Sequence, residues 1–328
     1  MKQKTILITG GAGYIGSVLV RQLLQNKYKV KVVDLLRFGG ESLLEVQSNP
    51  NFSFYPVDIR NKNKIEPLIK DVDSIVHLAA IVGDPACKQE PKLTKSINLN
   101  GSKQLYKMGN KAGCKQFIFA STCSNYGKMT NSNKYINEKS PLNPISLYAE
   151  TKVSFEKFLL KQPKTNKCKP TCLRFATVYG IGPRVRFDLT VNEFTKELAL
   201  GKELLIFGEQ FWRPYCHVAD LTRAIELIIK SKSEKVAFDI FNVGNTKENY
   251  TKKMIVNEIM KQLPKSKIRY VKKEEDPRDY KVNFDKIKNK LKYKTTKKVK
   301  DGIKEIISLV KSGLISNTED QKYYNSKK

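Results

Sequence analysis

The sequence predicts an α/β fold, in which a doubly wound parallel sheet is joined to a smaller mixed α/β C-terminal lobe. In the first half of the 328 residues, short apolar runs alternate with longer amphipathic stretches, as in parallel sheets with crossover helices. A glycine cluster separates the first apolar run from the first amphipathic stretch. After Gly180 the alternation loosens, which indicates that a second lobe begins there.

This alternation predicts each element in turn. Apolar runs rich in β-branched and aromatic residues predict strands over residues 5–8, 30–33, 52–55, 74–78, 117–119, 171–173, 204–207 and 238–241. Amphipathic spacing predicts helices over residues 14–25, 93–112, 146–160, 191–200, 221–229, 252–262 and 300–309. Residues 320–328 are polar, and we expect them to be frayed.

A glycine-rich turn joins the first strand to the first helix. Gly10, Gly13 and Gly16 follow the strand with the spacing Gly-x-x-Gly-x-x-Gly. A tight turn and the close approach of a pyrophosphate both require residues without a Cβ. The helix that opens at Tyr14 and Ile15 offers free N–H groups and a positive dipole end to phosphates. Glycines between a strand and a helix therefore predict a Rossmann-type dinucleotide site.

Acidic side chains end the next two strands. Asp34 follows the second strand, where a carboxylate accepts hydrogen bonds from ribose hydroxyls and repels a 2′-phosphate. This favours NAD over NADP, although Arg37 is near enough to leave the choice open. Asp58 follows the third strand, where it can reach the adenine amino group. We expect NAD to bind to residues 1–180 with return segments near 215–245, and the substrate to residues 181–214 and 246–328.

Further short motifs lie along the chain: His77-Leu78-Ala79-Ala80, Asn98-Leu99-Asn100-Gly101, Ser121-Thr122, Tyr148-x-x-x-Lys152, Arg213-Pro214-Tyr215, Phe241-Asn242-Val243-Gly244 and Asp276-Pro277-Arg278-Asp279. With the glycine turn, they resemble the extended short-chain dehydrogenase/reductase family, in its nucleotide-sugar epimerase and dehydratase branch, over residues 4–312. The resemblance implies a bound NAD, held also by Ile59, Leu78, Ala79, Ala80 and Asn98, and a nucleotide-diphosphate sugar as substrate. It also implies a homodimer formed through the helices near 93–112 and 146–160.

The Tyr-x-x-x-Lys spacing is uninformative by itself, because it also begins at Tyr135, Tyr293, Tyr323 and Tyr324. Tyr148 and Lys152 differ from the other pairs because they lie on a predicted helix that follows the fifth strand. Their spacing puts both side chains on one face of that helix.

The resemblance assigns chemistry to this pair. An ammonium beside a phenol is expected to lower the pKa of Tyr148 from its usual value of about 10, and the positive nicotinamide ring adds to this effect. Tyr148 then acts as general base on a sugar hydroxyl. Thr122 hydrogen-bonds to the same hydroxyl, and Lys152 also holds the nicotinamide ribose.

The residues after Thr122 distinguish reactions within the family. Its 4,6-dehydratases carry Asp-Glu there, whereas this chain has Cys123 and Ser124, which are poor substitutes for a paired acid and base. This favours an epimerase, which oxidises a sugar hydroxyl at C4 to a ketone and returns hydride to the other face. A 4-ketoreductase, a 4,6-dehydratase and a catalytically silent NAD-binding scaffold are the alternatives.

Three arginines are candidates for binding the substrate. The resemblance places Arg213 and Arg278 at the diphosphate, a role that suits guanidinium forks. Arg184, with Arg186 beside it, follows Gly182 and is a weaker candidate for the sugar or its phosphates. By position alone, Asp84 and Cys87 are placed to shape the sugar pocket.

Composition excludes several classes of protein. The net charge of +29 is spread along the chain and no nucleic-acid-binding motif accompanies it, so we expect anionic sugar nucleotides rather than nucleic acid as partners. No apolar run approaches the roughly 20 residues that span a bilayer, which predicts a cytoplasmic protein with no membrane partner. Six cysteines without a Cys-x-x-Cys pair and two histidines predict free, mostly buried thiols and no metal site.

Overall fold

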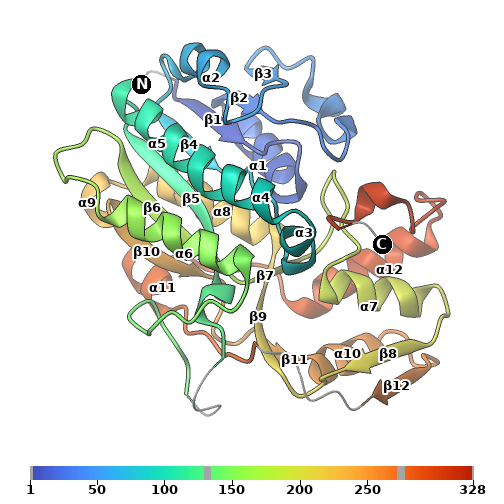
Figure 1. The fold of residues 1–328 in the computed structure, drawn as a ribbon. Helices are drawn as coiled ribbons and strands as arrows, with labels where there is room; N and C mark the ends of the chain where they lie inside the picture. Colours follow the sequence, from blue (N-terminus) through green and yellow to red (C-terminus); the bar gives the residue numbers. More distant parts are fainter. Residues whose placement is uncertain (1–2, 129–133, 272–277, 327–328) are drawn as a thin grey trace.

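A computed structural model describes residues 3–128, 134–271 and 278–326, and a seven-stranded parallel sheet forms its centre (Figure 1). The strand order is β10-β6-β5-β4-β1-β2-β3. The strands are β1 (Thr5–Thr9), β2 (Lys29–Val33), β3 (Phe52–Tyr55), β4 (Ser74–His77), β5 (Gln116–Thr122), β6 (Lys169–Phe175) and β10 (Asp239–Val243). The predicted doubly wound sheet is therefore confirmed. Its order reverses between β1 and β4, and sheets of this kind bind ligands at the carboxyl ends of the strands beside such a point.

Helices cover both faces of the sheet and enclose two apolar cores (Figure 1). The side chains of β1 alternate between them, because Ile6 and Ile8 enter one core and Leu7 enters the other. The first core lies against α1 (Tyr14–Gln25) and α8 (Val218–Lys230), and the second against α2 (Lys62–Ile69), α5 (Ser102–Lys111) and α6 (Leu147–Leu160). All six cysteines are free and buried, as predicted.

The helix predicted over residues 93–112 is not uniform. It consists of α4 (Pro91–Lys95), a π-helical turn (Ser96–Gly101) and α5. In the π turn, Asn98 turns its amide to the loop after β4, where it accepts from the Ile81 N–H at 2.8 Å and donates to the Ile81 carbonyl at 2.9 Å. Such turns often occur where a helix serves a functional site.

The smaller lobe contains a third apolar core and two further sheets. One sheet has the order β11-β9-β7, and the other pairs β12 with β8. Its strands and helices are β7 (Thr177–Tyr179), α7 (Thr190–Ala199), β8 (Leu204–Phe207), β9 (Trp212–His217), β11 (Asn249–Thr251), α10 (Lys252–Met260), β12 (Ile268–Val271) and α12 (Val299–Lys311). The sequence did not predict β7, β9, β11 or β12, because they are short and carry polar residues that weaken the strand pattern.

Shorter helices complete the described chain. They are the 3-10 turns η1 (Glu41–Val46), η3 (Cys123–Tyr126) and η4 (Gln321–Tyr323), and the helices α3 (Asp84–Gln89), α9 (Ser233–Val236) and α11 (Asp285–Leu291). None of the helices in the described ranges combines the length and apolar character that crossing a bilayer requires.

The prediction that residues 320–328 are frayed is wrong for the residues described there. Tyr324 is only 7% exposed, and its hydroxyl accepts a hydrogen bond from the Lys196 ammonium at 2.9 Å. The Tyr323 carbonyl accepts the Phe187 N–H at 3.0 Å. Two tyrosines thus give an otherwise polar segment enough apolar surface to pack.

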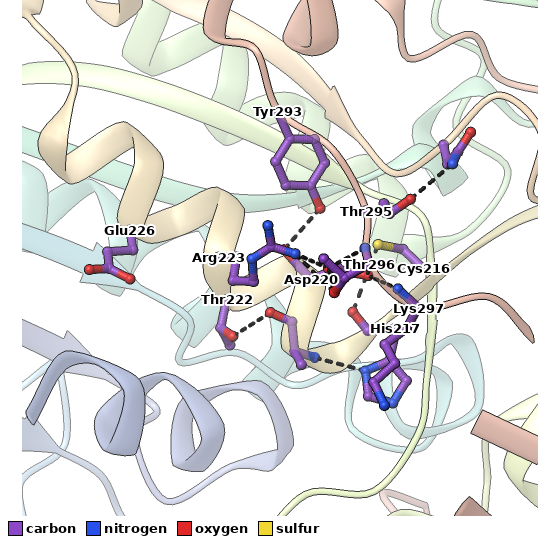
Figure 2. Close-up of polar contacts among 12 residues, drawn as sticks. Cys216, His217, Asp220, Thr222, Arg223, Glu226, Tyr293, Thr295, Thr296 and Lys297 are labelled. Carbon is purple, nitrogen blue, oxygen red and sulfur yellow. Dashed lines mark hydrogen bonds and ion pairs between the residues drawn. The ribbon is translucent and has the colours of Figure 1, made fainter. Parts of the chain in front are cut away.

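A buried carboxylate ties the C-terminal chain to α8 (Figure 2). Asp220, in the first turn of α8, has no exposed surface and accepts the N–H groups of Thr296 and Lys297, each at 3.0 Å. The Tyr293 hydroxyl donates to the main-chain carbonyl of Asp220 at 2.9 Å. Because a buried carboxylate is tolerated only when it is hydrogen-bonded, these contacts fix the segment that leads into α12.

Glu305→Gln is expected to lower stability at neutral pH through the neighbouring ion pair. Burial opposes ionisation of Glu305, but hydrogen bonding and charge from His217 (2.9 Å) and Lys297 (3.1 Å) outweigh it and lower the pKa of Glu305 to about 2. A depressed carboxyl pKa stabilises above the unfolded value, near 4.5, and this contribution is lost as the pH falls toward 2. In urea unfolding, the free energy of unfolding of Glu305→Gln should be about 2–3 kcal/mol below that of the wild type at pH 7, and this difference should shrink by more than half at pH 3. An equal deficit at both pH values would contradict this account.

Candidate active site

The glycine turn has the geometry that a dinucleotide requires. Gly10 has a φ of +79°, and a Cβ on it would lie 2.7 Å from the Ala79 backbone nitrogen. A Cβ on Gly16 would lie 2.1 Å from the Gly10 carbonyl oxygen. At Gly13 the nearest atom is that same oxygen, at 3.2 Å, and no side chain of the described residues caps α1. The first turn of α1 is thus open to a phosphate, and these residues fit NAD.

The side chains of Tyr14 and Ile15, at the start of α1, contact the protein itself and give no sign of binding the cofactor. Tyr14 is buried, and its hydroxyl donates to the Gly180 carbonyl at 2.5 Å. Ile15 packs against one apolar core. What these two residues can offer a phosphate is therefore their backbone N–H groups.

Asp34 lies at the edge of the glycine turn. Its carboxylate accepts the N–H groups of Ala12 at 3.0 Å and Leu36 at 2.9 Å. Burial raises the pKa of Asp34, and these hydrogen bonds oppose that rise. Arg37, which complicated the choice between NAD and NADP, forms an ion pair with Glu90 at 2.9 Å. Its charge is therefore already matched by a carboxylate.

Arg184 lies on the cofactor side of the site. Its guanidinium carbon stacks over the Phe38 ring at 3.9 Å, and its charge opposes the rise in the pKa of Asp34 that burial causes. Its Nε is buried without a hydrogen-bond partner among the described residues. Burial, with the charge of Arg186, lowers the pKa of Arg184 to about 10. A buried cation with a spare donor suits an anionic ligand.

The other predicted cofactor residues surround the ends of β3 and β4. Asp58 pairs with Arg60 at 2.6 Å, and this hydrogen bond holds the pKa of Asp58 below its usual value. Asn98 uses its amide to hold the loop after β4, so a direct contact with a dinucleotide stays a prediction. Ile59 is buried, whereas Leu78, Ala79 and Ala80 keep some exposed surface where β4 ends.

Thr122, Tyr148 and Lys152 come together at the carboxyl edge of the sheet. Thr122 ends β5, and its hydroxyl oxygen accepts the Ser124 N–H at 3.1 Å and lies close enough to the Tyr148 hydroxyl to oppose the rise in the pKa of that phenol. The Lys152 ammonium lies 5.7 Å from the centre of the Tyr148 ring and donates to the Ala120 carbonyl at 2.8 Å. Because β1, β4 and β5 are parallel neighbours, this cluster and the glycine turn share one edge.

The prediction that Lys152 lowers the pKa of Tyr148 is wrong for the chain by itself. Burial, together with the charges of Cys87 and Asp84, raises the pKa of Tyr148, and opposing effects from Arg186 and Thr122 are smaller. Burial likewise lowers the pKa of Lys152, to about 8. The same desolvation that encloses the pair disfavours both charged forms. A positive charge beyond the chain's own is therefore needed to favour a phenolate.

A buried ion pair lies behind this cluster. Glu156, one turn after Lys152, pairs with Arg174 on β6 at 2.7 Å, and both side chains are almost fully buried. Glu156 also accepts a hydrogen bond from Ser121, the neighbour of Thr122 on β5. The network therefore links α6, β5 and β6 directly behind the predicted catalytic residues. Glu156 and Arg174 were not predicted as site residues, and only the fold shows that they meet Ser121.

Two of the predicted substrate arginines meet at Tyr280. Arg213, on β9, stacks over the Tyr280 ring at 5.2 Å, and Arg213 and Arg278 both oppose the rise in the pKa of Tyr280 that burial causes. The Tyr280 hydroxyl reaches Ser124, after Thr122, at 3.4 Å. This places both cations beside the catalytic cluster. Asp276 and Pro277 of the same motif lie outside the described residues.

Asp84 joins the arginines to the catalytic helix. It forms an ion pair with Arg278 at 2.9 Å and accepts a hydrogen bond at 2.7 Å from Ser146, the N-cap of α6. Ser146 and Tyr280 were not predicted as site residues. The N-cap position of Ser146, directly before the Tyr148 helix, was the only signal that could have suggested the first.

Comparisons with known proteins agree with this geometry. A UDP-glucose 4-epimerase of Lactobacillus helveticus is 30% identical over 256 residues, which cover 73% of this chain and 76% of the relative. The crystal structure of a UDP-glucose 4-epimerase from Thermotoga maritima with UDP-glucose has a TM-score of 0.83 and 29% identity, covering 94% of this chain and 99% of that chain. A dTDP-glucose 4,6-dehydratase from Streptomyces venezuelae with NAD bound has a TM-score of 0.83 and 25% identity, covering 98% of each chain.

A family model described as the NAD dependent epimerase/dehydratase family matches residues 6–244, which include the glycine turn and the Thr122, Tyr148 and Lys152 cluster. The match covers well over half of the chain. The relatives and the solved structures named above are enzymes of this same kind. The chain therefore belongs to the NAD dependent epimerase/dehydratase family, and it is an NAD-dependent enzyme of the nucleotide-sugar epimerase/dehydratase type.

Proposed function

We propose that this chain is an NAD-dependent nucleotide-sugar epimerase that inverts C4 of its sugar. The observation that carries the proposal is the meeting of Thr122, Tyr148 and Lys152 beside the glycine turn, with no paired acid and base after Thr122. Relatives named as UDP-glucose 4-epimerases support the same reaction.

Each catalytic side chain has a distinct role in this proposal. Tyr148 takes the proton from the sugar hydroxyl and later returns it, and Thr122 orients that hydroxyl. Lys152 holds the nicotinamide ribose. When bound, oxidised NAD supplies a hydride acceptor and the positive charge that the buried Tyr148 needs. The ketone formed in between must turn over in the pocket before the hydride returns to its other face.

The binding residues divide between cofactor and substrate. Residues 1–180, with return segments near 215–245, hold NAD, and residues 181–214 and 246–328 hold the sugar nucleotide. Arg213 and Arg278 bind the substrate diphosphate. Both lie near Tyr280, which is beside the cluster of predicted catalytic residues. Arg184 is an exception within residues 181–214, because it lies beside Asp34, and we therefore assign it to the cofactor instead of the sugar or its phosphates. A homodimer formed through α5 and α6 is part of the same proposal.

The residue that follows Thr122, Cys123, argues against a dehydratase. Cys123 is buried, and its thiol faces the Arg174 carbonyl at 3.3 Å. Burial raises the pKa of the Cys123 thiol well above its usual value. A thiol turned inward in this way cannot serve as a proton donor or acceptor at a sugar carbon.

The purified chain should convert a sugar nucleotide to its C4 epimer without net consumption of NAD. UDP-glucose, UDP-glucuronic acid and dTDP-glucose are incubated in turn with the enzyme, and NMR follows the anomeric protons for a galacto-configured product. A 4-keto-6-deoxy product would identify a dehydratase, and net oxidation of added NADH would identify a reductase. Binding of NAD without turnover of any of these sugars would favour a silent scaffold.

A further inference from the structure

A buried histidine connects three parts of the cofactor site. His77 is the last residue of β4 and the register partner of Thr9, the last residue of β1, at the centre of the sheet (Figure 1). Its Nδ1 lies 2.7 Å from the Thr9 hydroxyl, and its Nε2 lies 2.8 Å from the hydroxyl of Ser102, the first residue of α5. All three side chains are at most 1% exposed, so a ligand does not touch them.

The proton positions in this chain of hydrogen bonds follow from counting donors. The Ser102 hydroxyl oxygen lies 2.9 Å from the Asn98 carbonyl oxygen and 3.2 Å from that of Ile97, and a carbonyl oxygen only accepts. The single hydroxyl proton of Ser102 therefore points to these carbonyls, and its oxygen accepts the Nε2–H of His77. The Nδ1 of a neutral imidazole is then unprotonated, and it accepts the Thr9 hydroxyl proton.

The surroundings of His77 favour this neutral form. Three phenylalanine rings surround the imidazole, with their centroids 5.7 to 6.0 Å from its own. Burial, with a smaller effect from the charge of Lys152, lowers the pKa of His77 to about 3. In the other neutral tautomer, Nδ1–H would donate to Thr9, and the Thr9 proton would then have no acceptor among the described residues.

The two ends of this chain of hydrogen bonds both contact the loop after β4. Thr9 directly precedes Gly10, where a Cβ would lie 2.7 Å from the Ala79 nitrogen, and the Thr9 oxygen accepts the Ala79 N–H at 3.4 Å. At the other end, Asn98 holds the Ile81 main chain through both atoms of its amide. The imidazole therefore sets the spacing between the glycine turn and the π-helical turn, with the loop between them.

We propose that His77 is a positioning residue for NAD. Its Nε2-protonated imidazole holds the glycine turn, the loop after β4 and the π-helical turn in the arrangement that the dinucleotide requires. The inference concerns the cofactor alone and goes beyond the proposed reaction, because it applies whichever sugar is bound. Since His77 and its two partners are buried, their effect on NAD affinity is transmitted through the turn and the loop.

Thr9→Val removes one hydroxyl from this chain of hydrogen bonds and keeps the β-branched shape of the strand residue. The change leaves Nδ1 of His77 without a donor. The affinity of the full chain for NAD, measured by titration calorimetry on cofactor-free protein, should fall by about 3- to 10-fold. Thr9→Ser keeps the hydroxyl, and its affinity for NAD should stay within a factor of about two of the wild type.

Thr171→Val is the matched control for a lost hydroxyl. Thr171 is 1% exposed on β6, three strands from β1 in the same sheet, and it donates to the Val236 carbonyl at 2.8 Å. Thr171→Val thus loses one buried hydrogen bond of the same kind, away from the glycine turn. Its affinity for NAD should equal that of the wild type.

NMR of the histidine nitrogens tests the proton positions directly, because the chain has only two histidines. In the unsubstituted chain His77 should carry its proton on Nε2 and none on Nδ1, and Thr9→Val should shift the Nδ1 signal. Glu305→Gln identifies the signals of the second imidazole, since Glu305 lies 2.9 Å from Nε2 of His217.

Three outcomes would overturn the proposal. A proton on Nδ1 of His77 in the unsubstituted chain would contradict the hydrogen-bond directions, and this spectrum does not depend on how Thr9→Val folds. Unchanged NAD affinity of Thr9→Val would show that the imidazole does not position the cofactor site. Equal weakening by Thr9→Val and Thr171→Val would show that lost stability, rather than the position of the glycine turn, reduces NAD binding.

Discussion

Tyr148→Phe is expected to reduce turnover of the sugar nucleotide by about 10²- to 10⁴-fold, the usual contribution of a positioned general base. The change removes one hydroxyl and keeps the ring, which packs against an apolar core. Bound NAD should therefore be retained, and the affinity for the sugar nucleotide should change little. Steady-state turnover, with the NAD content of the purified protein, separates loss of chemistry from loss of cofactor.

The chain provides a matched control for this change. Tyr135 begins the same Tyr-x-x-x-Lys spacing, but it is 47% exposed and lies outside the catalytic cluster. Tyr135→Phe should leave turnover within a factor of about two, since exposed substitutions of this kind rarely matter. Turnover by Tyr148→Phe at the wild-type rate would show that another group removes the hydroxyl proton.

Glu156→Gln is expected to cause the largest loss of stability, about 3–5 kcal/mol, because it leaves the Arg174 cation buried without its counter-charge. The side chains of both residues are at most 3% exposed, so water cannot replace the lost partner. Urea unfolding at pH 7 measures the loss. Turnover should also fall, since Ser121 and Thr122 are adjacent on β5 and Ser121 is held by Glu156.

Replacing the whole pair distinguishes an unpaired charge from simple loss of packing. The double variant Glu156→Leu with Arg174→Met removes both charges, and it should recover more than half of the stability that Glu156→Gln loses. Glu150→Gln, on the exposed side of the same helix, should cost less than about 1 kcal/mol. If the double variant is less stable than Glu156→Gln, the unpaired charge is not the cause.

The sequence by itself was enough to predict the strands and the glycine turn that form the cofactor site. Apolar runs located β1 to β6 and β10, and the three glycines between β1 and α1 identified the dinucleotide turn. Both signals are local, because a buried parallel strand needs consecutive apolar residues and a tight turn needs residues without a Cβ. For the same reason the helix with Tyr148 and Lys152 could be placed from its position after β5.

The tertiary structure alone decided which distant groups meet and how their charges behave. Asn325 lies 243 positions from Val82, and no spacing rule connects them. The i, i+4 spacing predicted that Lys152 lowers the pKa of Tyr148. In the fold both groups lose hydration, and burial disfavours the charged form of each. Burial and long-range contact are properties of the packed chain, so the sequence located the predicted catalytic residues, while the fold decided which groups surround them and in which direction burial shifts their pKa values.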